Sequence, residues 1–98
     1  MNRITFADEA LEDLDSIYRY IAEDNMVAAD RHREQLRRRW EQLVVQPRMG
    51  RVRDDLKPGY RSITEGEYVI FYRIVSEQQV QVMRVLHGKQ DLGKALSD

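Results

Sequence analysis

The spacing of apolar residues changes along the first half of the chain from a strand pattern to a helix pattern. Ile4 and Phe6 alternate with a polar residue, which predicts a short strand. From Asp8 the apolar residues recur at intervals of three and four, and this spacing predicts two amphipathic helices. Their apolar positions are Leu11, Leu14, Tyr18 and Ile21 in the first helix and Ala29, Leu36, Trp40 and Leu43 in the second.

Two sites set the boundaries of these helices. Asp24-Asn25 predicts a stop and a restart, because Asn is a favourable helix N-cap. The second helix should end near Val45, since the residue before Pro47 disfavours the helical region. Two helices joined so closely are expected to form an antiparallel hairpin.

The second half of the chain is typical of strands and turns. Strands are predicted over 60–64, 68–75 and 80–87, with turns at 65–67 and 76–79. The polar tail from Gly88 is expected to be at most partly ordered. The prediction is a single α+β domain over 1–98 with the order β-α-α-β-β-β, in which the helical hairpin packs on one face of a small, mostly antiparallel sheet.

The last two strands carry arginines inside apolar runs. A four-residue loop over 76–79 would place Val75 opposite Val80, Arg73 opposite Val82 and Phe71 opposite Arg84. Because side chains alternate between faces, both arginines should then share one face. That face should also hold Val69, Phe71 and Leu86, and it should be open or covered by something outside this chain. The other face should lie under the helices and hold Tyr68, Ile70, Tyr72, Ile74, Met83 and Val85, with Gln81 and His87 at its ends.

Composition changes the predicted fold little, but the distribution of charge along the chain indicates a possible interaction surface. The 98 residues are 42% apolar, carry a net charge of −1 and include no cysteine, so no disulfide framework or thiolate metal site is expected. With no membrane-length apolar run, a soluble cytoplasmic protein is expected. Residues 1–29 hold two basic and seven acidic residues, whereas residues 30–61 hold ten basic and five acidic ones. Such a block indicates either an interaction surface or a solvated helix face.

No motif for hydrolysis, phosphate binding or metal ligation occurs in the chain, and no cofactor is expected. His87 could act as a general base, although a hydrogen-bonded structural histidine is the favoured interpretation. Arg73 and Arg84 could bind phosphate or carboxylate, or could form the polar face of a one-sided sheet, and both interpretations stay open.

Four stretches in order resemble the ParE branch of the RelE/ParE superfamily of toxins from type II toxin–antitoxin modules. They are DLDSIYRYIAEDN at 13–25, QPRMGRVRDDLKPGYR at 46–61, YVIFYRI at 68–74 and RVLHGKQD at 84–91. The resemblance covers almost the whole chain and implies the β-α-α-β-β-β layout described above.

The RelE-like branch implies ribosome-dependent cleavage of messenger RNA by a set of basic residues. Here Val69 and Gln90 stand where that branch has arginines, only Arg61 represents the two lysines of the preceding strand, and no tyrosine follows Tyr72. If the chain were a ribonuclease, its catalytic residues would be Arg61, Arg84 and His87. This activity is the alternative, together with an inactive antitoxin-binding relative.

The ParE-like branch implies inhibition of DNA gyrase by protein contact, without catalysis, and neutralisation by a ParD-like antitoxin in a larger hetero-oligomer. No membrane partner and no sequence-specific nucleic-acid binding are expected. The resemblance implies a target-binding set, and the helical hairpin with the basic excess over residues 30–61 indicates where the antitoxin would bind. The target-binding candidates are Arg61, Arg73, Arg84, His87 and Lys89, and the antitoxin-binding candidates are Tyr18, Arg31, Arg38, Arg51 and Arg53.

Overall fold

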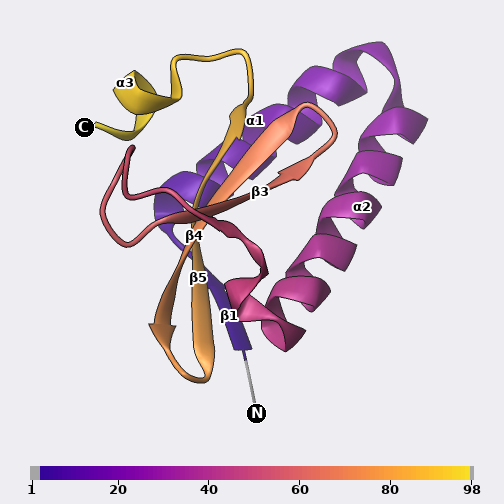
Figure 1. The fold of residues 1–98 in the computed structure, drawn as a ribbon. Helices are drawn as coiled ribbons and strands as arrows, with labels where there is room; N and C mark the ends of the chain where they lie inside the picture. The colour runs from indigo at the N-terminus through magenta and orange to yellow at the C-terminus, as the bar shows by residue number, and fades with distance from the viewer. Residues whose placement is uncertain (1–2, 98) are drawn as a thin grey trace.

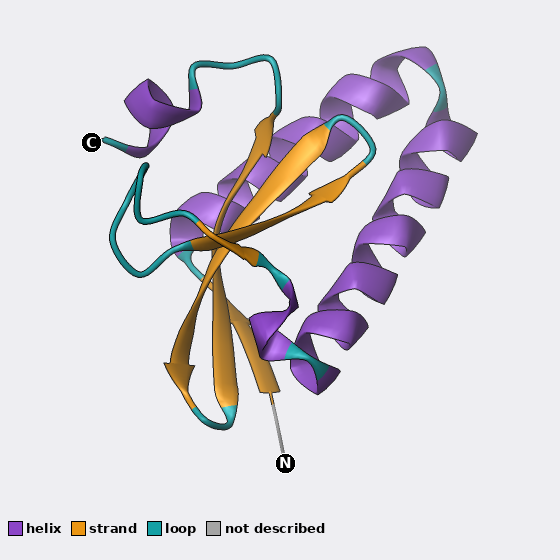
Figure 2. Cartoon of the chain, viewed as in Figure 1, coloured by secondary structure: helices purple, strands orange, loops and turns teal. Residues whose placement is uncertain are grey.

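A single five-stranded sheet carries two long helices on one face in the computed structural model, which describes residues 3–97 (Figure 1). The strand order is β1-β5-β4-β3-β2; β1 runs parallel to β5, and the other neighbours are antiparallel. The predicted α+β class and the helical hairpin are confirmed (Figure 2). The strands are β1 (Arg3–Phe6), β2 (Arg51–Val52), β3 (Arg61–Glu65), β4 (Tyr68–Ser76) and β5 (Gln79–His87), and the helices are α1 (Asp8–Asp24), α2 (Met26–Val45), the 3-10 helix η1 (Pro47–Met49) and α3 (Leu92–Leu96).

Asn25 forms the joint of the helical hairpin, as the sequence predicts. Its backbone N–H donates to Ile21 at 2.8 Å and closes α1, while its side-chain oxygen accepts the N–H of Ala28 at 3.0 Å and caps α2. One residue therefore ends the first helix and begins the second. The helices fold back on each other and cover the same side of the sheet (Figure 1).

The main core lies between this hairpin and the sheet. Ala10 of α1, Leu43 of α2 and Ile70, Tyr72 and Val82 of the sheet are fully buried there. Leu43, Ile70 and Tyr72 are positions that the apolar spacing predicted for this core. The prediction was wrong for Leu11, which is 51% exposed, and the neighbouring Ala10 is buried instead.

The pairing of β4 with β5 differs from the expectation. The turn has only two residues, and a bulge at Met83 sits where β4 passes from Phe71 to Tyr72. Phe71 does lie opposite Arg84, but the predicted pairs of Val75 with Val80 and Arg73 with Val82 were wrong. A shift of one residue in the pairing also changes the face on which a side chain lies. The observed pairs are Tyr72 with Val82, Arg73 with Gln81, Ile74 with Val80 and Ser76 with Gln79.

This shift moves side chains between the two faces of the sheet. Val80 and Val82 belong to the core under the helices, and Met83, which was expected there, packs on the opposite face. We call the face away from the helical hairpin the outer face.

The outer face is partly covered by the chain itself, contrary to the expectation of an open surface. Residues Leu92, Ala95 and Leu96 of α3 pack against Phe71 and Leu86 of the sheet. Phe71 is fully buried and Leu96 is 4% exposed. The predicted polar tail therefore contains an ordered helix, which the expectation of partial order missed.

None of the helices within residues 3–97 has the length and apolar character needed to span a bilayer.

Candidate functional site

Arg84, predicted as an exposed contact for a target, is held by two other elements of the fold. Its guanidinium donates to both carboxylate oxygens of Asp13 on α1, at 2.7 and 3.1 Å. It also donates to the backbone oxygen of Ala95 in α3 at 3.3 Å. The Arg84 and Asp13 side chains are only 22% and 15% exposed. Arg84 thus joins β5 to α1 and α3, and it is not free to bind a target.

Asp13 occupies this position because β1 is short. β1 pairs with β5 only as far as Val82, so the edge of β5 beyond that residue has no neighbouring strand. The carboxylate of Asp13 accepts the N–H of Val85 at 3.0 Å and satisfies this edge. The hydrogen bond from Arg84 to Asp13 raises the pKa of Arg84, and burial opposes that rise. The guanidinium of Arg84 therefore stays charged at any physiological pH.

Arg61 lies on the side of β3 that faces the helices and is also engaged. Its guanidinium donates to the backbone oxygens of Gly50 at 2.9 Å and Arg48 at 3.3 Å. The hydroxyl of Tyr72 anchors the same segment, because it accepts the N–H of Gly50 at 2.8 Å and donates to the Pro47 oxygen at 2.7 Å. Arg61 therefore fixes the turn between η1 and β2.

His87 ends β5 beside the aromatic ring of Tyr68, with ring centroids 5.3 Å apart. Its Nδ1 accepts the backbone N–H of Lys89 at 3.1 Å, so a neutral ring carries its proton on Nε2. Nε2 lies 3.7 Å from a carboxylate oxygen of Glu67. These contacts match the structural role favoured by the sequence.

A cavity of about 410 Å³ lies between α1 and the end of β5, and Arg84 and His87 form part of its wall. Asp13 and Glu67 also line it, so two carboxylates face the same space. Arg61 is not part of this wall. The three residues of the predicted ribonuclease set are therefore not brought together around one open site.

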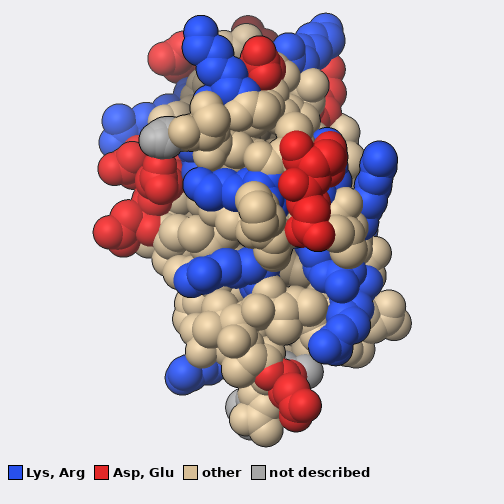
Figure 3. All heavy atoms as spheres, turned by 60° about the vertical axis from the view of Figure 1, so that its left-hand side comes forward, with Lys and Arg blue, Asp and Glu red and all other residues tan. Residues whose placement is uncertain are grey.

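Arg73 and Lys89 remain exposed among the predicted target-binding residues. Arg73 lies on the outer face and donates to the Gln81 side-chain oxygen at 3.0 and 2.9 Å, a contact that leaves its charge unneutralised. Figure 3 brings the side of the molecule with α3 forward and shows Lys and Arg side chains there, with acidic groups beside them.

Two arginines predicted for antitoxin binding share this outer face. Arg51 pairs across the ladder with Ser62, which pairs with Phe71. Arg53 donates to the Ser62 hydroxyl at 3.4 Å and forms an ion pair with Asp55 at 3.2 Å. The structure therefore joins one target-binding candidate and two antitoxin-binding candidates on one surface.

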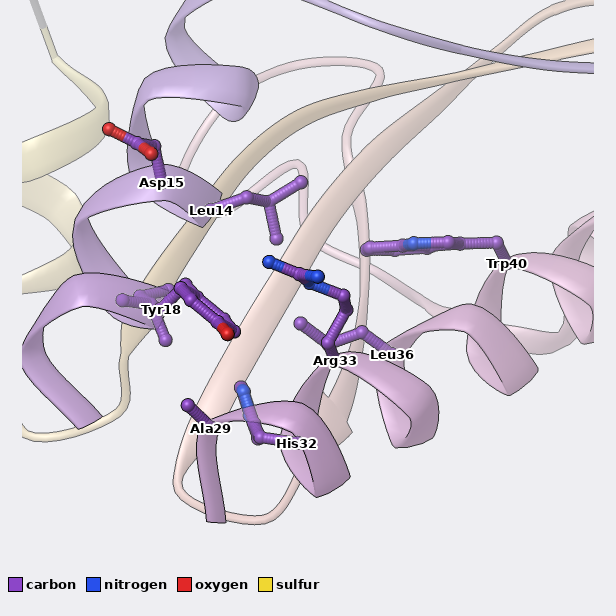
Figure 4. Close-up of a pocket in the computed structure, with 9 residues that line it drawn as sticks. Leu14, Asp15, Tyr18, Ala29, His32, Arg33, Leu36 and Trp40 are labelled. Atoms are coloured by element: carbon purple, nitrogen blue, oxygen red, sulfur yellow. The ribbon is translucent and has the colours of Figure 1, made fainter. Parts of the chain in front are cut away.

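A separate cleft of about 250 Å³ opens between α1 and α2 (Figure 4). Tyr18 lines it, and its hydroxyl donates to Asp30 at 2.7 Å, which raises the pKa of Tyr18. The guanidinium of Arg33 lies 4.0 Å from the centre of the Tyr18 ring. No local pattern in the sequence predicts this role for Arg33, because a contact between helices depends on how the hairpin closes. Arg31 and Arg38 are exposed on α2.

His32 lines the same cleft and packs against Tyr68, with ring centroids 5.1 Å apart. Its Nε2 is buried, and no described residue provides a hydrogen-bond partner for it. Burial lowers the pKa of His32, while the charge of Glu65 opposes this shift. Within residues 3–97, acidic and histidine side chains do not gather in threes as a metal site would require.

Comparison with known proteins places this fold in a family. Residues 4–92 match the family model described as the ParE toxin of the type II toxin–antitoxin system parDE. Toxin ParE3 of Caulobacter vibrioides is 31% identical over 97 residues, covering 98% of this chain and 96% of its own. Toxin ParE1 of Mycobacterium tuberculosis is 34% identical over 68 residues, or 69% of each chain.

A solved structure supports the same architecture. The chromosomal ParDE toxin–antitoxin system from P. aeruginosa contains a chain that superimposes with a TM-score of 0.72 at 21% identity, covering 89% of this chain and 96% of that one. At this identity the likeness shows the fold alone. With the family match over residues 4–92, the chain belongs to the ParE toxins of type II toxin–antitoxin systems.

Proposed function

We propose that this ParE-family toxin acts in the cytoplasm by inhibiting DNA gyrase through a protein surface, without catalysis, and that a ParD-like antitoxin neutralises it. The observation that carries the proposal is that each residue a ribonuclease would need is bound to a different part of the chain itself. Arg84 is neutralised by Asp13, Arg61 is bound to backbone oxygens, and His87 accepts a backbone N–H.

Phosphodiester cleavage requires preorganised positive charge on the phosphate and a proton acceptor beside it. In the cavity next to His87, the charge of Arg84 is offset by Asp13, and Glu67 adds a second carboxylate. A phosphate there would meet two negative groups. Releasing Arg84 would break a partly buried ion pair, which costs several kcal/mol when one partner is left behind.

Inhibition by contact needs only an exposed, complementary surface. Arg73 and Lys89 provide exposed positive charge on the outer face and at the end of β5. We assign target contact to these two residues and a structural role to Arg61, Arg84 and His87. The antitoxin would use the helical hairpin, where the cleft beside Tyr18 is lined by both helices, and the complex would form a larger hetero-oligomer.

Two assays on the purified toxin test the proposal. We expect it to inhibit supercoiling of relaxed plasmid by gyrase in a dose-dependent way, and to leave ribosome-bound messenger RNA uncut in primer extension. Arg73→Gln should weaken the inhibition, because it removes an exposed charge while keeping a hydrogen-bonding side chain. Arg31→Gln is the matched control, since Arg31 is exposed on α2 away from the outer face.

The assays separate the alternatives. Cuts at defined codon positions that disappear in His87→Ala, with supercoiling unaffected, would replace this proposal with a ribonuclease. No effect in either assay, from toxin with a native melting transition, would favour an inactive relative that only binds antitoxin.

A further inference from the structure

One half of the outer face lies beyond the cover of α3. That helix packs over Phe71 and Leu86 at one end of the face, and the sheet extends past it to the turn between β4 and β5 (Figure 1). Side chains on this second half alternate along each strand with those that point into the core under the helices. We call this surface the open half, and its residues are Arg3, Thr5, Arg73, Gln79 and Gln81.

Hydrogen bonds within the open half use its acceptors and leave donors over. Arg73 donates to the side-chain oxygen of Gln81 at 3.0 and 2.9 Å. Because an arginine can only donate, the amide oxygen of Gln81 must face it, and the NH2 group is turned away. Gln79 donates its amide to the hydroxyl oxygen of Thr5 at 3.3 Å, which leaves the hydroxyl proton of Thr5 to donate elsewhere. The surface therefore suits a partner that presents acceptors.

The charge of the open half is positive and uncompensated. Arg3 and Arg73 are exposed, as is Arg51 at the β2 edge of the same face, and no described carboxylate forms an ion pair with any of the three. β1, β2, β4 and β5 contain no aspartate or glutamate. Two strand intervals separate Arg3 from Arg73, and two more separate Arg73 from Arg51. Each pair of intervals spans about 10 Å of the sheet.

The lack of apolar anchors favours a nucleic acid over a protein as the partner. Protein interfaces have aromatic and apolar side chains at their centre, whereas protein–DNA interfaces are polar and positively charged. Of the large apolar side chains that are exposed within residues 3–97, only Val75 lies on β1, β4 or β5. Binding of single strands uses exposed aromatic rings for base stacking, and the ring of Phe71 is buried. The surface therefore fits the backbone of a duplex.

We infer that the open half binds the sugar–phosphate backbone of duplex DNA, and that in the inhibited complex this is DNA held by gyrase. The second part rests on the proposed function. Duplex DNA carries one negative charge per about 1.7 Å of its axis, so arginines spread over about 20 Å all meet phosphates. The amide of Gln81 and the hydroxyl of Thr5 then donate to phosphate oxygens. Such contacts position a protein on DNA without reading its sequence.

The test uses a fluorescein-labelled duplex of about 20 base pairs in two unrelated sequences. Fluorescence anisotropy measures its affinity for the purified toxin at several salt concentrations. Three phosphate contacts predict a slope of log K against log salt of about −2.7. Between about 20 and 150 mM salt the affinity should then fall about 200-fold, equally for both sequences.

Two triple variants compare this surface with the rest of the molecule. R3Q/R51Q/R73Q should bind at least about tenfold more weakly at low salt and lose most of the salt dependence. R19Q/R31Q/R38Q removes the same charge from exposed positions of the helical hairpin, and it should bind like the wild type. Arg73→Gln alone should make the slope less steep by about 0.9.

Other results would overturn the inference. These are no binding of the duplex by the wild type at low salt, equal losses in the two triple variants, or tighter binding of a single strand than of the duplex. Poly-glutamate that displaces the duplex at equal charge concentration would assign the surface to an acidic protein instead.

Gyrase assays separate this inference from the proposed function. Fluorescent toxin should bind gyrase more tightly when the enzyme holds DNA, and R3Q/R51Q/R73Q should lose that difference. If the wild type inhibits supercoiling but does not bind the duplex, the proposed function stands and the inference is wrong. If the wild type binds the duplex through these arginines but leaves gyrase active, the target assignment fails and the DNA-binding surface stands.

Discussion

Replacing Arg84 by alanine should destabilise the fold severely, although the sequence predicts that this arginine lies on the surface. The substitution leaves the carboxylate of Asp13 with the N–H of Val85 as its remaining hydrogen bond in the structure. It also removes the hydrogen bond to Ala95 that holds α3.

The magnitude follows from the burial of the pair. Hydrogen bonds to charged groups contribute about 1.5–3 kcal/mol, and breaking a fully buried pair costs about 3–5 kcal/mol. Because the side chains of Arg84 and Asp13 are 22% and 15% exposed, we expect a loss of about 2–3 kcal/mol. For a domain of this size each kcal/mol lowers Tm by about 4–8 °C, so Tm should fall by roughly 10–20 °C.

Urea unfolding and thermal melts, both followed by circular dichroism, measure this loss. Leu43→Ala provides an upper reference, since a fully buried leucine costs about 2–5 kcal/mol. Arg31→Ala is the matched exposed control and should cost under about 0.5 kcal/mol.

A second variant separates the ion pair from general damage to the fold. Asp13→Asn keeps an oxygen for the N–H of Val85 and removes only the charge, so it should cost less than Arg84→Ala. The double variant should cost less than the sum of the two single ones, because no unpaired carboxylate remains. An Arg84→Ala protein as stable as Arg31→Ala would refute the reasoning.

The remaining predictions concern pH, packing and the target surface. Burial lowers the pKa of His32 in the folded protein. The contribution of neutral His32 to the free energy of unfolding is therefore present above the unfolded-state pKa of about 6.5 and is lost as pH falls below it. The urea midpoint should therefore drop between about pH 7.5 and 5.5, and His32→Phe should reduce that drop. Gly50→Ala should destabilise by about 1–3 kcal/mol or more in the same unfolding assay, because its Cβ would overlap the buried ring of Tyr72. Gly93→Ala, where the nearest atoms are 3.7 Å away, should be tolerated. Arg73→Gln should keep the stability of the wild type within about 0.5 kcal/mol and reduce growth inhibition on expression; full toxicity would remove Arg73 from the target surface.

The exposure and partners of the candidate site residues were predicted less well than the helices and strands on which they lie. Arg73 and Lys89 are exposed as expected, whereas Arg61 and Arg84 are bound to other parts of the chain. The type of a side chain shows what it can bind, but its partners depend on which segments meet in the fold. Arg84 and Asp13 are 71 positions apart in the sequence, and no local pattern links them.

Elements with local signals could be predicted from the order of residues alone. Apolar spacing defined the two helices and the main strands, Asn25 defined the joint between the helices, and Pro47 defined the end of α2. These signals suffice because helix periodicity, capping and proline geometry act over a few residues.

The register of β5 and the packing of α3 on the outer face depend instead on contacts between distant segments. The bulge at Met83 moved Val82 under the helices, and α3 came to lie on Phe71 although the tail that forms it is mostly polar. Both features arise from packing between distant segments. A one-residue slip in a strand leaves its local pattern intact but reverses its faces, and a five-residue helix has too few hydrogen bonds to form without the surface that it covers.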